Sequence, residues 1–406
     1  MSHTNIVALL LVASMSPISA VAQPAEAETL AQALARGDTS VDLRYRYEFV
    51  DSDVFDLDAH ASTLRTALGY RTLPFKGFSF FAQAQNVSVI GDDKYNNRGA
   101  AHLSNGVRDR PVVADPSQTR MQQAYLRIDA FDTAVDVGRR EIFYGDHRFI
   151  GDVRWRQNHQ TFDALHLSSK ALDRTTLSYT FVDRVVRIFG DEKEMSSHFL
   201  NGLVQVKPDI SIEMFAYLLD YQEEQDFNLS SQTYGFRALG EHAVRDNVGL
   251  VFEAEYARQA DYASNTSDLG ASYLELMGGV DLKRWVRVKV GREFLGAAEG
   301  RLAFQTPLAT GHKFNGWADR FLVTPRDGLV DWYVSANGAL RKLSWVATYH
   351  SFSADGGGRA YGSELDAQAT YPTSWRQSFA FKFALYRENG FASDVSKIWL
   401  WTQYSF

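Results

Sequence analysis

Apolar and polar residues alternate along long stretches of the chain, most clearly near its start. One face of an extended segment carries only apolar and aromatic residues: Val41, Leu43, Tyr45, Tyr47 and Phe49. The other face carries only charged residues: Asp42, Arg44, Arg46 and Glu48. Successive residues of a β-strand point to opposite sides. The segment is therefore typical of a strand between apolar and aqueous surroundings, either in a soluble sandwich or in the wall of a membrane barrel.

The same test predicts 18 strands, at residues 41–50, 61–70, 78–90, 120–128, 134–143, 161–169, 176–185, 197–206, 210–221, 231–239, 248–259, 271–281, 285–294, 328–336, 342–352, 361–371, 378–388 and 397–406. Short connections alternate with longer ones along the chain. The short connections are 71–77, 129–133, 170–175, 207–209, 282–284, 337–341 and 372–377. The connections between them include the long polar segments 91–119, 144–160 and 295–327. Bacterial barrels have short periplasmic turns and longer external loops. The pattern predicts an all-β fold, a transmembrane antiparallel β-barrel of about 18 strands in an up-and-down meander with both termini on the periplasmic side.

The start of the chain is different in kind. Residues 1–22 contain no Lys, Arg, Asp or Glu, and their apolar run is too short to cross a membrane as a helix. With Ala20-Val21-Ala22 before Gln23, they predict a signal peptide at 1–22 for export into the outer membrane of a Gram-negative cell. A weak helical pattern follows, so we expect a short periplasmic N-terminal segment at 23–40 and one barrel domain at 41–406.

The last predicted strand ends on an aromatic residue, with one face formed by Ile398, Leu400, Thr402, Tyr404 and Phe406. This resembles the C-terminal signature by which outer-membrane proteins are recognised by their assembly machinery. Tyr404 and Phe406 are therefore the predicted contacts with that machinery.

Composition removes several classes of function. The chain has no stretch of about 18 apolar residues, which argues against a helical membrane protein. Cysteine is absent, so no disulfide, zinc-thiolate site or cysteine nucleophile can form. A net charge of −7 argues against nucleic acid as a partner. We expect no cofactor and no metal, and we expect membrane lipid and lipopolysaccharide as surroundings.

Several stretches carry a resemblance to a known family. They are Leu43-Arg44-Tyr45-Arg46-Tyr47-Glu48; Val137-Gly138-Arg139-Arg140 running into 144–151; Trp155-Arg156-Gln157; Thr161-Phe162-Asp163; Phe304-Gln305-Thr306-Pro307-Leu308; the block from His312 to Asp331; and Tyr361-Gly362-Ser363-Glu364-Leu365-Asp366. They resemble the alginate-export family of outer-membrane proteins over nearly the whole mature chain. The resemblance implies an 18-stranded barrel that passes the anionic polysaccharide alginate outwards through an arginine-lined constriction, with periplasmic export components as partners. The turn from Pro372 to Gln377 departs from alginate exporters, which carry a long periplasmic loop there.

Charged residues on the non-apolar strand faces are the candidates for the lumen wall, because Arg or Lys at mid-bilayer facing lipid costs about 2–4 kcal/mol. The basic candidates are Arg44, Arg46, Arg65, Arg127, Arg140, Arg237, Arg287, Lys289 and Lys382. The acidic candidates are Asp42, Glu48, Asp136, Glu253, Glu255, Glu364 and Asp366. In one reading, the basic residues form a series of weak binding sites for a carboxylate-bearing solute. In the other, basic and acidic residues form cross-strand ion pairs that only stabilise a hydrated lumen wall. Our hypothesis is that Arg44, Arg46, Arg127 and Arg237 set anion selectivity.

Two long loops carry further candidates. Segment 295–327 is predicted to be a constriction or gating loop through His312, Lys313, Asn315, Trp317, Asp319 and Arg320. The alternative is a surface lid that packs through its aromatic residues. Segment 144–160 concentrates charge at Asp146, His147, Arg148, Asp152, Arg154, Arg156 and His159, which favours a solvated rim near lipopolysaccharide over a ligand site. Its Asp and His spacing fits no standard metal motif.

These observations predict an outer-membrane channel for an anionic saccharide, either an alginate-like polymer or a uronate oligomer. The alternative is a substrate-selective diffusion porin for small organic acids or oligosaccharides, which the short turn at 372–377 favours. An outer-membrane hydrolase is the third class. The sequence has no Gly-x-Ser-x-Gly nucleophile motif, which argues against it.

Overall fold

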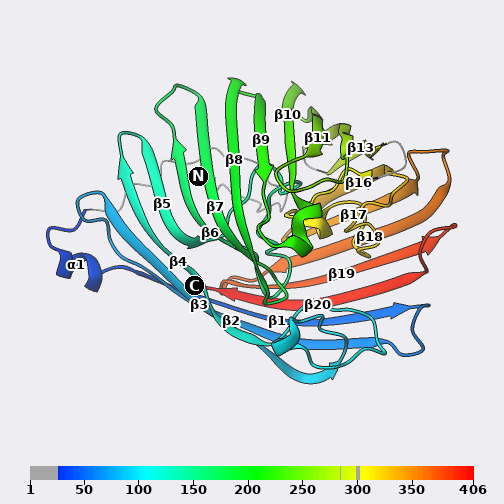
Figure 1. Cartoon of the computed structure of the whole chain (residues 1–406), viewed down its shortest axis with the longest axis horizontal. Helices are drawn as coiled ribbons and strands as arrows, with labels where there is room; N and C mark the ends of the chain where they lie inside the picture. The colour runs from blue at the N-terminus through cyan, green and yellow to red at the C-terminus, as the bar shows by residue number, and fades with distance from the viewer. Residues whose placement is uncertain (1–25, 284, 299–301) are drawn as a thin grey trace.

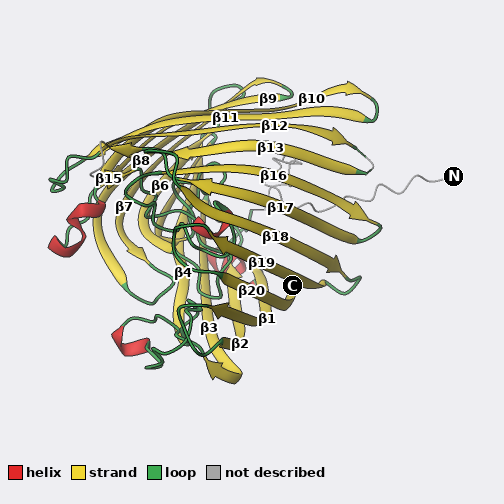
Figure 2. Ribbon diagram, turned by 90° about the vertical axis from the view of Figure 1, so that its right-hand side faces the viewer, coloured by secondary structure: helices red, strands yellow, loops and turns green. Residues whose placement is uncertain are grey.

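The alternating segments build one antiparallel sheet of 18 strands that closes on itself. In the computed structural model, which describes residues 26–283, 285–298 and 302–406, β1 (Asp38–Ser52) pairs with β2 (Ala59–Arg71) and also with the last strand, β20 (Val395–Ser405). Each other barrel strand pairs with its neighbours along the chain, so the sheet is an up-and-down barrel (Figures 1 and 2).

The remaining barrel strands are β3 (Phe78–Lys94), β4 (Gln118–Ala130), β5 (Thr133–Arg140), β6 (Thr161–Ser169), β7 (Thr175–Val186), β8 (Glu192–Lys207), β9 (Ile210–Leu219), β10 (Ser231–Arg245), β11 (Val248–Asp261), β12 (Gly270–Leu282), β13 (Val286–Leu295), β16 (Leu329–Leu340), β17 (Leu343–Ser353), β18 (Ala360–Pro372) and β19 (Gln377–Glu388). Two strands of two residues each, β14 (Ala297–Ala298) and β15 (Leu302–Ala303), form a separate small sheet between β13 and β16 in the sequence. The helices are α1 (Leu30–Ala35), η1 (Ala101–Leu103), η2 (Glu224–Leu229) and η3 (Gly311–Lys313).

All 18 predicted strands are present, which confirms the predicted fold class. Their ends differ by a few residues. β10 continues past the predicted end at residue 239 because Gly240 stays in the ladder opposite Phe252, where a Cβ would lie 2.5 Å from the phenylalanine ring. β5 ends at Arg140, before the predicted end at 143, where the chain leaves the sheet for the loop 141–160.

The two faces of the wall differ as the alternation predicts. On β1, Leu43 and Tyr45 are 37% and 38% exposed on the outside, whereas the inward Arg44 and Arg46 are buried. Large apolar side chains are exposed on the outer face all round the barrel. Examples are Phe80, Leu200, Leu276 and Leu365. An apolar outer face is what a strand in contact with hydrocarbon requires. Among the described residues, no helix is long and apolar enough to span a membrane.

The connections alternate between short and long, as expected. Those at one end are 72–77, 131–132, 170–174, 208–209, 246–247, 283–285, 341–342 and 373–376. At the other end, three connections are much longer than the rest: 95–117, 141–160 and 296–328. The helix α1 lies at the short-turn end, where the Leu73 N–H donates to the Ala33 carbonyl at 3.1 Å (Figure 1). The predicted signal peptide, 1–22, lies outside the described residues.

The apolar core is inside the barrel, not between two sheets. The ring of Phe149, from the loop 141–160, lies 5.0 Å from Phe215 on β9 and 5.3 Å from Tyr273 on β12. Phe304, from the loop 296–328, completes this group at 5.9 Å from Phe149. Aromatic packing of this kind fixes both loops against the inner wall. The long loops therefore narrow the lumen.

Candidate functional site

The loop 141–160 lies within the lumen against β1. The Arg44 guanidinium donates to the Gln157 side chain at 2.8 Å and to the backbone carbonyls of Arg154 and Arg156. Arg46 donates to the Trp155 carbonyl at 2.8 Å and pairs with Asp115 from the loop 95–117. Gln157 and Asn158 are fully buried. The expectation that 144–160 is a solvated rim is wrong, because most of its charged side chains are buried: Asp146, Arg148, Asp152, Arg156 and His159 are at most 9% exposed.

Arg156 joins three parts of the molecule. Its guanidinium lies 3.1 Å from Glu48 on β1 and 3.2 Å from Asp319 in the loop 296–328. Burial lowers the pKa of Arg156, but the carboxylates of Glu48, Asp115 and Asp319 outweigh that effect and raise it above the usual value. Glu48, a predicted lumen residue, is thus a loop anchor. Arg156 is a cation that stays charged within the protein.

The loop 296–328 is held against β18. The Trp317 and Ala318 N–H groups donate to the carboxylates of Asp366 and Glu364, at 3.1 and 2.6 Å. Just before them, Gly316 has φ +84°, and a Cβ at that position would lie 2.3 Å from a Glu364 oxygen. Only glycine fits this approach. The aromatic residues of the loop pack on their neighbours, as the lid alternative predicts: the Phe321 ring lies 4.5 Å from Phe352.

Lys382 on β19 is enclosed by the loops 141–160 and 296–328. Its ammonium lies 3.9 Å and 3.6 Å from the ring centroids of Trp155 and Trp317, and 2.7 Å from His312 Nε2. An ammonium can only donate, so Nε2 accepts and Nδ1 carries the proton that is donated to Asp319 at 2.7 Å. Burial lowers the pKa of His312 well below its usual value, and the neighbouring Lys382 lowers it further. A neutral His312 thus links Lys382 to Asp319.

Asp319 is the centre of this group, which we call the loop lock: Glu48, Arg156, His312, Asp319, Lys382 and Lys397. Lys397 on β20 lies 2.7 Å from Asp319. Burial alone would raise the pKa of Asp319, but His312, Lys397 and Arg156 hold it well below its usual range. The lock is a buried ion network that joins two inward loops to β1, β19 and β20. Such a network stabilises one arrangement only while all its members are present.

The opposite wall, β9 to β16, is acidic. Directly opposed residues form a row across adjacent strands: Glu213, Arg237, Glu255, Glu275, Glu293 and Asp331. Arg148 from the loop 141–160 reaches Glu293 at 2.6 Å, and Asn315 donates to the same carboxylate at 2.5 Å. Asp331 lies 2.9 Å from His350. Two of the row's carboxylates are therefore paired by groups from loops and from β17.

A different arrangement occupies β2, β4 and β5. We call it the arginine cluster: Arg71, Arg127 and Arg140 around Tyr125 and Asp136. Arg71 donates to the Tyr125 hydroxyl at 2.8 Å, Arg140 lies 5.5 Å from the Tyr125 ring centroid, and Arg127 and Arg140 share Asp136. The side chain of Arg127 is 34% exposed and that of Arg140 is 21% exposed. These guanidinium groups face water, unlike those of the loop lock.

The other predicted residues are distributed along the lumen face. Arg65 pairs with Asp42 and donates to Gln85 at 2.9 Å. Arg287 lies 2.8 Å from Glu241 and 2.5 Å from Asp281. Arg237 pairs with Glu253 at 2.5 Å. In the described part of the chain, Lys289 has no hydrogen-bond or ion-pair partner, and it is half-buried.

The remaining loop predictions can also be placed. Lys313 is 43% exposed, and its ammonium donates to the Asp146 carbonyl at 2.7 Å. Arg320 donates to Ser393 at 3.2 Å, and burial lowers its pKa. The two histidines of 144–160 have separate carboxylate neighbours: His147 lies 3.5 Å from Asp152 and His159 lies 2.7 Å from Glu141.

Sequence reasoning missed several of these residues. Glu275, Glu293, Asp331 and Lys397 lie on strand faces opposite apolar residues, so the alternation test could have found them. Arg71 belongs to the predicted connection 71–77, whereas in the structure it ends β2. Asp115 and Arg148 belong to loops, where no periodicity marks the inward face.

An antiparallel barrel with an apolar outer face, short turns at one end and charged loops inside a charged lumen is an outer-membrane channel. The chain belongs to the alginate export family, whose model matches residues 36–260. Family and fold are those of outer-membrane channels rather than of enzymes.

Solved structures show the same fold. Acinetobacter baumannii OccAB4 is 15% identical, with a TM-score of 0.70, over 95% of this chain and 99% of that one. A. baumannii OccAB2 is 15% identical, with a TM-score of 0.69, over 91% and 98%. Pseudomonas aeruginosa OccK5 (OpdH) is 10% identical, with a TM-score of 0.68, over 91% and 98%. No curated protein matches the chain. At these identities the likeness concerns the barrel, not the solute.

Proposed function

We propose that the channel passes short uronate oligosaccharides and that the arginine cluster binds their carboxylates on the way. The observation that carries the proposal is the partial exposure of Arg127 and Arg140 on the lumen face. Three arginines of the cluster meet two carboxylates, those of Asp129 and Asp136, so the cluster keeps a net positive charge.

The chemistry of guanidinium suits this step. A guanidinium group binds a carboxylate through two parallel hydrogen bonds. Its partial exposure to water keeps the interaction weak, which a channel needs so that the solute can leave. Membership of the alginate export family also favours a uronate as the anionic solute.

The arrangement of the loops supports a short solute. All three long connections contact inward side chains of the wall: 95–117 through Asp115, 141–160 through Arg148 and Arg156, and 296–328 through Asp319. The turn 373–376 is short, so nothing of the length found in alginate exporters projects from that position. These features favour an oligomer or a small organic acid over a polymer. Export of an alginate-like polymer remains the alternative, which family membership favours.

The sequence suggested that Arg44, Arg46, Arg127 and Arg237 all set anion selectivity. We propose that these arginines instead have different roles. Arg127, with Arg71 and Arg140, acts on the solute. Arg44 and Arg46 hold the loop 141–160, because both guanidinium groups donate to residues of that loop, while that of Arg46 also pairs with Glu48 and Asp115.

Reversal potentials in planar bilayers test this function. The triple variant Arg71→Gln, Arg127→Gln, Arg140→Gln should lose most of the anion preference, because the arginine cluster loses all three of its positive charges. A trimer of guluronate or mannuronate should block the single-channel current of the wild type, and a neutral trisaccharide of the same length should block it less.

A matched control is Arg174→Gln, an exposed arginine whose side chain is 65% accessible at the short-turn end. It should leave selectivity and block unchanged. Unaltered selectivity in the triple variant would refute the role of the cluster. Block by alginate polymer but not by the trimer would favour the exporter instead.

Several expectations stay predictions: export by a signal peptide at 1–22, assembly through Tyr404 and Phe406, contact with lipopolysaccharide and contact with periplasmic export components. In the structure, Phe406 exchanges two backbone hydrogen bonds with Val41, at 2.8 and 3.0 Å. The end of the chain therefore joins the seam where the barrel closes.

A further inference from the structure

The acidic wall contains more negative charge than its neighbours compensate. Glu293 pairs with Arg148, and Asp331 pairs with His350. Five further carboxylates lie together on this wall: Asp146, Glu213, Glu253, Glu255 and Glu275. Three cationic groups lie among them. Arg237 is 2.5 Å from Glu253, Lys313 is 3.4 Å from Asp146, and Lys289 lies on β13, the strand next to that of Glu275. An excess of two negative charges is left.

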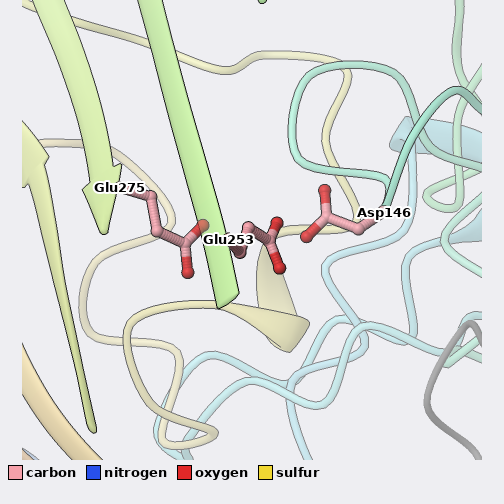
Figure 3. A group of neighbouring side chains, drawn as sticks. All are labelled: Asp146, Glu253 and Glu275. Carbon is pink, nitrogen blue, oxygen red and sulfur yellow. The ribbon is translucent and has the colours of Figure 1, made fainter. Parts of the chain in front are cut away.

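Three of these carboxylates converge on one point. Asp146, Glu253 and Glu275 each bring one oxygen to within 4.8 Å of the others. Figure 3 shows Asp146 and Glu275 pointing towards Glu253 from opposite sides. Two oxygens on opposite sides of one calcium ion lie about 4.6–5.2 Å apart, twice the usual Ca–O distance. One ion can therefore contact all three.

A fourth carboxylate adds an independent observation. Glu255 is 3% exposed, and its Oε2 has no hydrogen-bond partner among the described residues. Glu255 stands directly opposite Glu275 in the sheet, and it lies two residues from Glu253 on β11, so both point to the same face. A buried carboxylate oxygen without a partner is costly. A cation beside it removes that cost.

We propose that a divalent cation, calcium by its chemistry, binds in the lumen to Asp146, Glu253 and Glu275, with Glu255 as the neighbouring carboxylate. Calcium accepts six to eight oxygen ligands in flexible geometry, whereas magnesium demands a near-ideal octahedron. Every group in the cluster offers oxygen, including the Tyr333 hydroxyl, which lies 2.8 Å from Glu275. Neutralising an excess of two charges needs a divalent ion.

The site would fasten the loop 141–160 at a second place. Asp146 belongs to that loop, while Glu253 and Glu275 belong to β11 and β12. Arg44 and Arg46 already hold the far end of the same loop on β1. The cation would thus anchor the loop across the lumen, from one wall to the other. This inference does not depend on which solute the channel passes.

Calorimetric titration of calcium into detergent-solubilised, chelator-treated protein tests the site. The wild type should bind one calcium ion per chain in this cluster. Glu253→Gln and Glu275→Gln should each weaken binding by about tenfold or more, because ligand charge sets calcium affinity. The matched control is Glu241→Gln, a 49% exposed carboxylate of the same wall that pairs with Arg287. It should bind calcium as the wild type does.

Thermal unfolding provides the second measurement. Calcium should raise the Tm of the wild type, and it should not raise that of Glu275→Gln. In chelator, Glu275→Gln should be at least as stable as the wild type, because one of several opposed carboxylates is now neutral. Equal binding in wild type, Glu253→Gln and Glu275→Gln would mean adventitious surface binding and would overturn the proposal, as would the lack of saturable binding in the wild type.

Discussion

Arg46 and Arg127 are both arginines on the lumen face of strands, yet the structure places them in opposite environments. Arg46 is 2% exposed, held between the loop 141–160 and the carboxylates of Glu48 and Asp115. The Arg127 side chain is 34% exposed beside Asp129 and Asp136. The first position belongs to the buried network that fixes the loops, and the second to the open arginine cluster.

The difference teaches how one lumen can hold both kinds of charge. A buried ion pair in low dielectric is costly to break, because the remaining partner is left uncompensated. An exposed pair gains little and can exchange its partner for a solute carboxylate. Selectivity is therefore expected from the arginine cluster, and the shape of the lumen from the loop lock.

Arg156→Ala should give the largest effect. It removes the cation shared by Glu48 and Asp319, which are 1% and 8% exposed and keep only Arg46 and Lys397 as cationic partners. Breaking a buried ion pair costs up to about 3–5 kcal/mol. We expect a clear fall in Tm in detergent, together with a larger and noisier single-channel conductance as the loops separate from β1.

Arg156→Lys separates charge from geometry. It keeps the positive charge but loses the planar guanidinium group, whose two ends contact Glu48 and Asp319, so its Tm should lie between those of the wild type and the alanine variant. The exposed control Arg174→Ala, whose partner Asp173 is 93% accessible, should match the wild type. An Arg156→Ala channel with unaltered Tm and conductance would show that the loops are fixed by other contacts.

The strands and their inward faces could be predicted from the sequence because alternation with period 2 is a local signal. Arg44 and Arg127 look alike by that test, since each sits among outward apolar neighbours such as Leu43 and Leu126. What separates them is contact with loops far away along the chain. Arg44 meets Gln157, 113 residues on, and Lys382 meets His312, 70 residues back. No local pattern records such pairs.

The burial of the loop 141–160 could not be predicted from its local sequence either. Its density of charge is typical of a solvated segment, and only the complementary wall makes it a buried one. Arg148 has its partner Glu293 on β13, and Arg156 has its partner Glu48 on β1. The charged lumen and the charged loop were both visible in the sequence, but their pairing required the closed barrel.

Acid should weaken the loop lock through His312. Because the pKa of His312 lies well below 6.5 in the folded protein, the unfolded chain binds a proton that the folded one does not as the pH falls through about 6.5. Stability should then fall by up to about 1.4 kcal/mol per pH unit until the folded-state pKa is reached. The charged groups around the ring are Asp319, Lys382 and Arg156.

His312→Gln tests this, because glutamine can donate and accept without gaining a proton. The decrease in Tm between pH 7 and pH 5 should be smaller in His312→Gln than in the wild type. His159, whose pKa burial lowers to about 4, contributes with the same sign and should leave part of the decrease in place. His242→Gln, on a side chain that is 66% exposed, should retain the full dependence. Identical pH profiles in all three proteins would remove His312 from the lock.

Arg127→Ala should have the smallest effect on stability and is the sharpest test of the division between the two regions. Its pairs with Asp129 and Asp136 are partly solvated, at 2.9 and 3.4 Å, so their loss should cost less than about 1 kcal/mol. Block by a uronate trimer should nevertheless weaken several-fold, because one of the three exposed guanidinium groups is gone. Thermal unfolding and single-channel block on the same sample measure both quantities. A large fall in Tm without any change in block would place Arg127 among the structural charges, and the open cluster would then have no distinct role.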